Sequence, residues 1–204
     1  MKYSLKRILR DVRVVMDYNP DSRPLIEMGD APTLAIDQII QSRVLVAAKT
    51  VLEKAPLASI DTVKPLVGPV AWPTQAGIGM GYLVLPADFL RLAAIQMSDW
   101  QRPATIITEH SPEYAWQSSR FAGVRGNPQR PVAAIVRYSI GLVVELYASE
   151  AGPEVSLRRA LYVPTPAFDI DLCVDLPKAL YDDIISQCAI LTQNIIDSQI
   201  PTNV

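Results

Sequence analysis

The sequence offers few candidates for catalytic residues. The first is the single histidine, His110. It stands between Glu109 and Ser111, so a candidate base and a hydroxyl are neighbours in sequence. Acyl transfer also needs a nucleophile and an oxyanion site that the fold positions, and adjacency in sequence supplies neither. No GxSxG, HExxH, phosphate-loop or EF-hand pattern occurs. We therefore predict no catalytic residue. Among the functional hypotheses, we rank a hydrolase that depends on His110 last.

Three acids and two cysteines are the candidates for a metal or redox site. Asp169, Asp171 and Asp175 would share one face of an extended segment, because side chains alternate along a strand. A calcium loop would also need a turn glycine and a bidentate terminal glutamate, which this segment lacks. We expect either a solvated strand edge or a salt-bridge surface between subunits. Cys173 and Cys188 have no CxxC spacing, so we interpret them as buried thiols in a reducing cytoplasm and predict no metal.

The glycine-rich segment "GIGMG", residues 77–81, resembles a phosphate loop only superficially. A dinucleotide fingerprint requires a strand before the glycines and a helix after them, so that backbone amides converge on the phosphate. Here the pattern after the glycines is that of a strand, and no Lys-Ser or Lys-Thr pair follows. We expect a flexible loop and no cofactor.

Arginine and aromatic residues alternate between positions 100 and 130. The candidate interface residues are Trp100, Arg102, Tyr114, Trp116, Arg120, Phe121, Arg125 and Arg130. Arginine together with exposed Trp and Tyr is typical of the energetic centres of protein interfaces. The same mixture suits single-stranded nucleic acid. With 19 Lys and Arg against 21 Asp and Glu, the formal net charge is −2, which favours a protein partner.

Apolar residues at three-and-four spacing predict the helices that position these groups. They indicate a first helix at residues 4–18 capped by Ser4, and a second from about Thr33 to Lys54. The second helix is apolar around most of its circumference, so we expect a core on one side and a neighbour on the other. Ser111 and Pro112 begin a short helix ending near 119, and Pro177 opens a last helix that extends to 196.

Between the helices the pattern is that of strands. Residues 82–85 and 90–97 read as two strands separated by a corner at Pro86, which cannot donate to a sheet. Residues 132–152 predict a hairpin that turns near Ser139–Gly141, and a further strand follows at 155–166. The Pro- and Gly-rich segment 56–81 reads as short extended pieces and turns.

These elements predict an α+β fold in which the terminal helices pack as a small bundle. An antiparallel β-rich region, sandwich- or barrel-like and carrying one short helix, is inserted between them. The expected limits are 1–55 and 170–204 for the helical body and 56–169 for the insertion. The chain is 50% hydrophobic with a mean hydropathy of +0.17, yet no apolar run reaches the ~18 residues of a membrane span. Its surplus apolar surface is therefore expected to be buried in the fold or against other subunits. No signal peptide is apparent at the start, and nothing in the sequence indicates export.

The order of several segments resembles the head–tail connector (adaptor or ring) proteins of tailed bacteriophages, such as tail tubular protein A and the ring proteins of crAss-like phages. The resemblance rests on the opening helix and on these segments: "LAIDQIIQSRVLVAA", "YLVLPADFLRLAAIQMSDW", "SPEYAWQSSRFAGVRGNPQRPVAAI", "LVVELYASE", "LYVPTP" and "LPKALYDDIISQCAILTQNII". It spans nearly the whole chain. The long segment 56–81 departs from the family's pattern.

The resemblance implies a non-enzymatic virion protein that is made in the host cytoplasm and located at the head–tail junction or tail. Its partners would be eleven sister copies in a twelvefold ring, the portal protein, the next tail component, and the genomic DNA that passes through the lumen. It implies no membrane partner. The alternative is a cytoplasmic binding module that uses residues 100–130 to hold single-stranded nucleic acid or a host protein.

Overall fold

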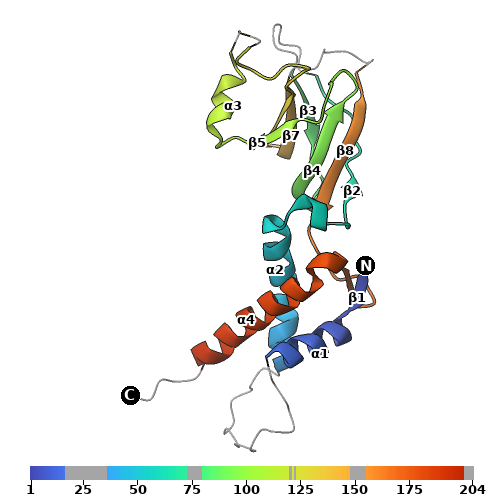
Figure 1. Cartoon of the computed structure of the whole chain (residues 1–204), viewed down its shortest axis with the longest axis vertical. Coiled ribbons are helices and arrows are strands. Elements are labelled where there is room, and N and C mark those ends of the chain that lie inside the picture. The colour runs from blue at the N-terminus through green and yellow to red at the C-terminus, as the bar shows by residue number, and fades with distance from the viewer. Residues whose placement is uncertain (17–35, 73–79, 120, 122, 148–154, 200–204) are drawn as a thin grey trace, which may run out of the picture. The chain divides into compact units, whose positions relative to one another are not determined.

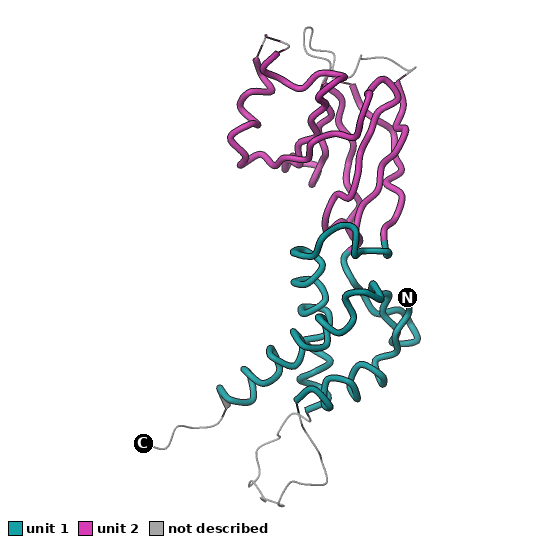
Figure 2. The backbone as a smooth tube through the Cα atoms, viewed as in Figure 1, with its two compact units in different colours: residues 1–62, 165–204 teal, residues 63–164 magenta. Residues whose placement is uncertain are grey.

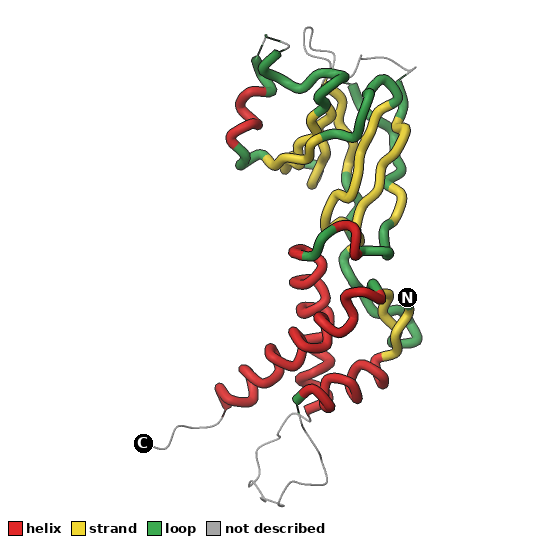
Figure 3. Tube along the Cα trace, viewed as in Figure 1, coloured by secondary structure: helices red, strands yellow, loops and turns green. Residues whose placement is uncertain are grey.

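The structure is a computed structural model of the 204-residue chain. It describes residues 1–16, 36–72, 80–119, 121, 123–147 and 155–199. The chain forms two compact units, Met1–Thr62 with Thr165–Val204 and Val63–Pro164 (Figure 2). The first unit is mainly helical and the second mainly strands (Figure 3). The predicted α+β class is confirmed, because the helices before and after the strand region pack together.

The described part of the helical unit contains three α-helices (Figure 1). They are α1 (Leu5–Val15), α2 (Ile36–Lys54) and α4 (Tyr181–Gln199), and α4 packs against both of the others. The predicted cap of the first helix is confirmed, since Ser4 Oγ accepts a hydrogen bond from the Arg7 amide over 3.4 Å. Thr33, the predicted cap of the second helix, lies outside the described residues. Pro177 opens a short 3₁₀ turn, η3 (Lys178–Leu180), and α4 begins only after it.

A small sheet ties the start of the chain to the segment that precedes α4. Strand β1 (Lys2–Ser4) pairs antiparallel with β9 (Cys173–Asp175). Behind it, the ring of Tyr3 stacks on that of Tyr181 with centroids 4.1 Å apart. The Tyr181 hydroxyl donates to Asp11 over 2.8 Å, which joins α1 to α4. Burial and then the Asp11 carboxylate raise the pKa of Tyr181 well above its ordinary value.

The described residues of the strand unit form two sheets. The first has the order β2-β8-β4, and the second has the order β3-β7-β6-β5. Their strands are β2 (Lys64–Pro65), β3 (Met80–Val84), β4 (Phe89–Met97), β5 (Thr105–Thr108), β6 (Val132–Tyr138), β7 (Gly141–Tyr147) and β8 (Leu157–Pro164). The predicted hairpin is β6–β7, in which Tyr138 pairs with Gly141 and the glycine adopts a φ of 122°. Among the described strands of this unit, β5 and β6 pair in parallel and the other pairs are antiparallel.

The corner at Pro86 carries the chain from one sheet to the other, because β3 pairs with β7 whereas β4 pairs with β8. Asp88 fixes this corner: its carboxylate accepts from the Tyr162 hydroxyl over 2.9 Å and from Lys64 Nζ over 2.8 Å. The hydrogen bond from Lys64 lowers the pKa of Asp88 below its ordinary value, against the opposing effect of burial.

The main core of the strand unit lies between the two sheets. Its buried residues are Leu66, Leu83, Leu85, Leu92, Ile95, Met97, Trp100, Ala133, Val144, Leu146, Ala160 and Tyr162. The segment 64–71 lies along the edges of both sheets. Leu66 donates its amide to Ala160 of β8 over 2.9 Å, and Ala71 exchanges two backbone hydrogen bonds of 2.9 Å with Tyr82 of β3. The unit is therefore a sandwich that closes toward a barrel.

Gly81, the last residue of the glycine-rich segment, lies within β3 rather than in a loop. A Cβ atom at this position would stand 2.7 Å from Val70 and 2.9 Å from Trp72. The glycine therefore permits a close approach of these side chains to the strand. Residues 77–79 of the predicted loop lie outside the described residues.

Candidate functional site

The arginine- and aromatic-rich segment leads from β4 through β5 to the short helix α3 (Pro112–Trp116) and then to β6. The predicted start of α3 is confirmed, with Ser111 at the N-cap and Pro112 in the first turn. Ser111 Oγ does not cap the helix; it accepts the amide of Thr108 over 3.1 Å. The hydroxyl thus stabilises the turn between β5 and α3.

Gln117 fastens α3 to the loop that follows. Its side chain is buried; Nε2 donates to the Glu113 carbonyl over 3.0 Å, and Oε1 accepts the Gly126 amide over 2.9 Å. A Cβ on Gly126 would meet Val132 at 3.2 Å and this same Gln117 oxygen at 3.3 Å. The loop can lie so close to the sheet because position 126 has no side chain.

Asn127 closes the end of the loop before β6. Its Oδ1 accepts the amides of Gln129 over 3.0 Å and Arg130 over 2.9 Å. The Gln101 amide donates to the Pro128 carbonyl over 3.0 Å, which joins this turn to the segment after β4. The described part of the segment is therefore held by hydrogen bonds at several points.

The predicted interface residues occupy very different environments. Trp100 is a core residue with 1% of its surface exposed, so it is not available at the surface of this chain. Tyr114 is half-buried and packs on the second face of the four-stranded sheet. Arg120 lies outside the described residues. The exposed ones are Arg102, Trp116, Phe121 and Arg130.

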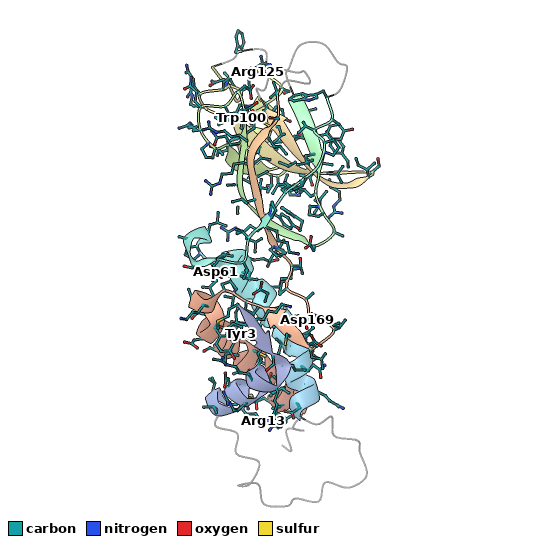
Figure 4. The ribbon with its side chains drawn as sticks, turned by 90° about the vertical axis from the view of Figure 1, so that its right-hand side faces the viewer. Tyr3, Arg13, Asp61, Trp100, Arg125 and Asp169 are labelled. Atoms are coloured by element: carbon teal, nitrogen blue, oxygen red, sulfur yellow. The ribbon has the colours of Figure 1, made fainter. Side chains whose placement is uncertain are left out.

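Arg125 is half-buried, and its Nη1 atom is buried without a hydrogen-bond partner among the described residues. Figure 4 shows Arg125 toward one end of the strand unit, with Trp100 further inside the same unit. The Arg125 amide and that of Val124 both donate to the Phe121 carbonyl, over 3.2 and 3.0 Å. The backbone therefore makes a compact turn in this part of the loop.

Three large apolar side chains are exposed on this short stretch: Trp116, Phe121 and Val124. Phe121 has 62% of its surface exposed. Val124 was not among the predicted residues; the signal available was an apolar residue between the two glycines of "AGVRG". Together with the exposed Arg102 and Arg130, this group has the composition of a protein-binding surface. We call Trp116, Phe121 and Val124 the apolar loop patch.

The other residues that could take part in catalysis or redox chemistry are placed as follows. His110 is exposed and stands 3.7 Å from Glu109, whose other oxygen accepts the Arg137 amide over 3.2 Å. The Ser111 hydroxyl is engaged with Thr108 and not with His110. Cys188 is buried, and burial raises the pKa of its thiol to about 11. Cys173 is half-buried.

The three aspartates do not form one face. Asp169 accepts the amides of Asp171 over 3.0 Å and Cys173 over 2.8 Å, and it pairs with Lys2. Asp175 pairs with the Met1 amino group. Within the described ranges, no group of three or more His, Cys, Asp or Glu residues could hold a metal ion.

No described helix is both long enough and apolar enough to cross a lipid bilayer. No protein-family model matches the chain, and no curated protein matches it.

Proposed function

We propose that this chain is a non-enzymatic structural protein of a tailed-phage virion, one of twelve subunits of a ring between the portal and the tail. DNA would pass through the lumen of the ring. The proposal rests on the order of segments that resembles the connector proteins. Within that frame, the helical unit docks on the portal, and the strand unit meets its neighbours and the next tail component.

One structural observation supports the proposal: both units expose large apolar side chains on helices and turns. In the strand unit this is the apolar loop patch. In the helical unit, Ile170 has 98% of its surface exposed and Val14 has 73%. Single exposed apolar residues are ordinary, but several of them on one short segment, as in the apolar loop patch, are typical of surfaces that another protein covers. A ring subunit has neighbours on two sides and components above and below, so both units would be covered.

The charge balance is compatible with a DNA channel. Each phosphate that a basic wall neutralises releases counterions and adds affinity, so a strongly basic lumen would hold the genome. With a formal net charge of −2, the subunit as a whole has no such excess of positive charge.

Reconstitution tests the role of the apolar loop patch. The purified full-length chain is mixed with portal rings and imaged by electron microscopy. We expect an additional ring on the portal, and we expect a Trp116→Ser, Phe121→Ser double variant to add it poorly. Val84→Ser, which removes an exposed valine from β3, is the matched control and is expected to behave as the unmodified chain. Portal rings that remain bare with the unmodified chain would contradict the proposal.

The second candidate is a cytoplasmic module that binds single-stranded nucleic acid or a host protein. The observation that favours it is the exposure of Trp116 and Phe121 on the same segment as Arg102 and Arg130, because bases stack on aromatic rings beside basic groups. A gel shift with single-stranded DNA or RNA that weakens as salt rises would support this module. Absence of a shift favours the connector.

A further inference from the structure

Residues 169–173, which connect the bridge residue Phe168 to β9, form a turn built around one carboxylate. Asp169 Oδ1 accepts the amides of Asp171 and Cys173, and Oδ2 accepts from Lys2 Nζ over 3.0 Å. The Asp169 amide donates to the Cys173 carbonyl over 2.8 Å. These bonds close a five-residue loop whose conformation is fixed. We call residues 169–173 the aspartate turn.

The aspartate turn presents two apolar side chains to solvent. Ile170 is almost fully exposed, and half of the Leu172 surface is exposed as well. Leu172 has a φ of 53°, a region that glycine, asparagine and aspartate occupy at lower cost than leucine. In a turn that faced only water, a polar residue at position 170 would avoid exposing an apolar side chain, and Asn or Gly at position 172 would adopt the positive φ at lower cost. The residues present are those expected if a partner covers the turn.

The outer face of α1 offers a complementary surface. Lys6, Arg10 and Val14 are four residues apart, so they form one stripe along the helix, and all three are exposed. Val15, next to the end of this stripe, is exposed as well. The basic–apolar stripe, as we call Lys6, Arg10 and Val14, thus combines positive charge with an apolar end.

The two surfaces carry opposite charges. The segment 167–175 contains Asp169, Asp171 and Asp175 and no basic residue, while α1 contains Lys6, Arg7, Arg10 and Arg13 against the single acid Asp11. Within the chain, Asp169 and Asp175 pair with Lys2 and the Met1 amino group, Arg7 and Arg10 pair with Asp11, and Arg13 pairs with Asp37. The charges that can face a partner are therefore Asp171 on the turn, and Lys6 with the largely exposed Arg10 on the stripe. Asp171 is exposed next to Ile170, just as Arg10 is exposed one helical turn before Val14. An apolar residue beside an acid can therefore face an apolar residue beside a base.

The aspartate turn cannot reach the apolar end of its own stripe. The Leu172 carbonyl accepts the Leu5 amide over 2.9 Å, which fixes the turn at the start of α1. Val14 lies near the other end of the helix, about 14 Å along its axis at 1.5 Å per residue. In Figure 4, Arg13 lies toward the lower end of the helical unit and Asp169 lies higher in the same unit. Two complementary surfaces that cannot meet within one chain can meet between copies.

We propose that the aspartate turn of one copy docks on the basic–apolar stripe of the next, with Ile170 against Val14 and Asp171 facing Arg10. The contact joins different surfaces of the two copies, so it repeats head to tail and closes into a ring where the rotation allows. The inference rests on the proposed function in that it names the contact between ring subunits. Its own test does not require the portal or a virion.

Photocrosslinking of the full-length chain tests the contact directly. Unlabelled protein with benzoylphenylalanine in place of Ile170 is mixed with ¹⁵N-labelled unmodified protein at high concentration, irradiated and digested. We expect crosslinks from position 170 to the labelled peptide that begins at Val14. The matched control carries the crosslinker in place of Asp183, an exposed residue of α4, and is expected to give no such product. Absence of crosslinks between copies, or crosslinks to another surface, would overturn the inference.

Substitutions provide an independent test by sedimentation. Ile170→Asp is expected to weaken self-association about tenfold or more, because burial of an isoleucine side chain changes a dissociation constant by at least that factor. Ile140→Asp replaces another exposed isoleucine, in the β6–β7 turn, and is expected to leave association unchanged. Asp171→Lys should weaken association, and addition of Arg10→Glu should restore it. Unchanged association in Ile170→Asp contradicts the inference.

The two proposals fail in distinguishable ways. Rings on the portal together with crosslinks that avoid the stripe would refute this contact and leave the connector function in place. Crosslinks between position 170 and Val14 in a protein that never adds to portal rings would support the contact and refute the connector function.

Discussion

The Glu145 carboxylate accepts a hydrogen bond from the Tyr147 hydroxyl over 2.6 Å, in the interior of the second face of the four-stranded sheet. Glu145 has only 3% of its surface exposed. Its other oxygen accepts the Tyr138 hydroxyl, also over 2.6 Å. A buried carboxylate is costly unless it is hydrogen-bonded, and here two phenols supply those bonds. Burial and then Glu145 raise the pKa of both tyrosines, so both hydroxyls remain protonated and continue to donate.

Removal of the Tyr147 hydroxyl is expected to destabilise the chain. Tyr147→Phe leaves one oxygen of a buried carboxylate without that donor, which costs about 1–3 kcal/mol. Tyr138→Phe is the matched variant and should cost less, because Tyr138 is only half-buried and water can replace its hydroxyl. Urea denaturation measures both. An equal or larger effect at Tyr138 would contradict this account of the network.

Trp100 and Trp116 are predicted to respond in opposite ways. Trp100→Ala removes the largest fully buried side chain of the strand unit and should cost about 3–5 kcal/mol of unfolding free energy. Trp116→Ala removes an exposed ring, so it should change stability by about 0.5 kcal/mol or less while impairing assembly on the portal. Guanidinium denaturation gives the first quantity and electron microscopy the second. A strongly destabilised Trp116→Ala variant would show that this ring belongs to the core.

Acid is expected to destabilise the helical unit through two aspartates. Hydrogen bonds from the Cys173 amide and then Lys2 lower the pKa of Asp169 below 3.8. For Asp11, burial acts to raise the pKa, but hydrogen bonds from Tyr181 and Arg10 outweigh it and lower the value below 3.8. A lowered folded-state pKa gives stability that is complete above the unfolded value and lost as the pH falls through the folded value.

Thermal unfolding between pH 6 and pH 2.5 measures this effect. The melting temperature should be nearly constant above about pH 4.5 and should fall below it. Asp169→Asn and Asp11→Asn variants should show a smaller decrease, since each lacks one of the groups that titrate. If the melting temperature of both variants decreased by as much as that of the unmodified chain, the acid sensitivity would belong to other carboxylates.

Leu172→Asn is predicted to stabilise the isolated chain and to weaken its self-association. Asparagine adopts positive φ more readily than leucine, so the gain should be about 0.5–1 kcal/mol. The lost apolar surface would reduce docking of the aspartate turn. Thermal unfolding and sedimentation of the same sample give both quantities. A variant that is less stable would show that the Leu172 side chain contributes to the fold of its own chain.

The sequence predicted the elements that depend on local signals. Ser4 caps α1 as expected, Pro112 begins α3, and the hairpin turns at Ser139–Ile140 before Gly141. Each signal acts within a few residues through one backbone requirement, such as a free amide or a positive φ. Such requirements can be recognised in the sequence without knowledge of the rest of the fold.

Long-range relationships could not be predicted in the same way. Pro86 indicated a corner, but nothing local shows that the two strands beside it join different sheets. Trp100 and Trp116 both occur beside arginines, yet one is in the core and the other at the surface. Tyr147 can donate to Glu145 because alternation along β7 places both side chains on one face of the sheet. Tyr114 of α3 packs on that same face. These outcomes depend on which segments meet in space.

A reconstruction of the head–tail junction of virions that contain this chain tests the central claim most directly. We predict a ring of twelve copies between the portal and the tail, in which the exposed apolar residues Ile170, Val14 and Phe121 are all covered by neighbouring chains. Location of the chain on the capsid lattice or on a fibre, or copies at the junction whose apolar surfaces remain open to solvent, would contradict the account.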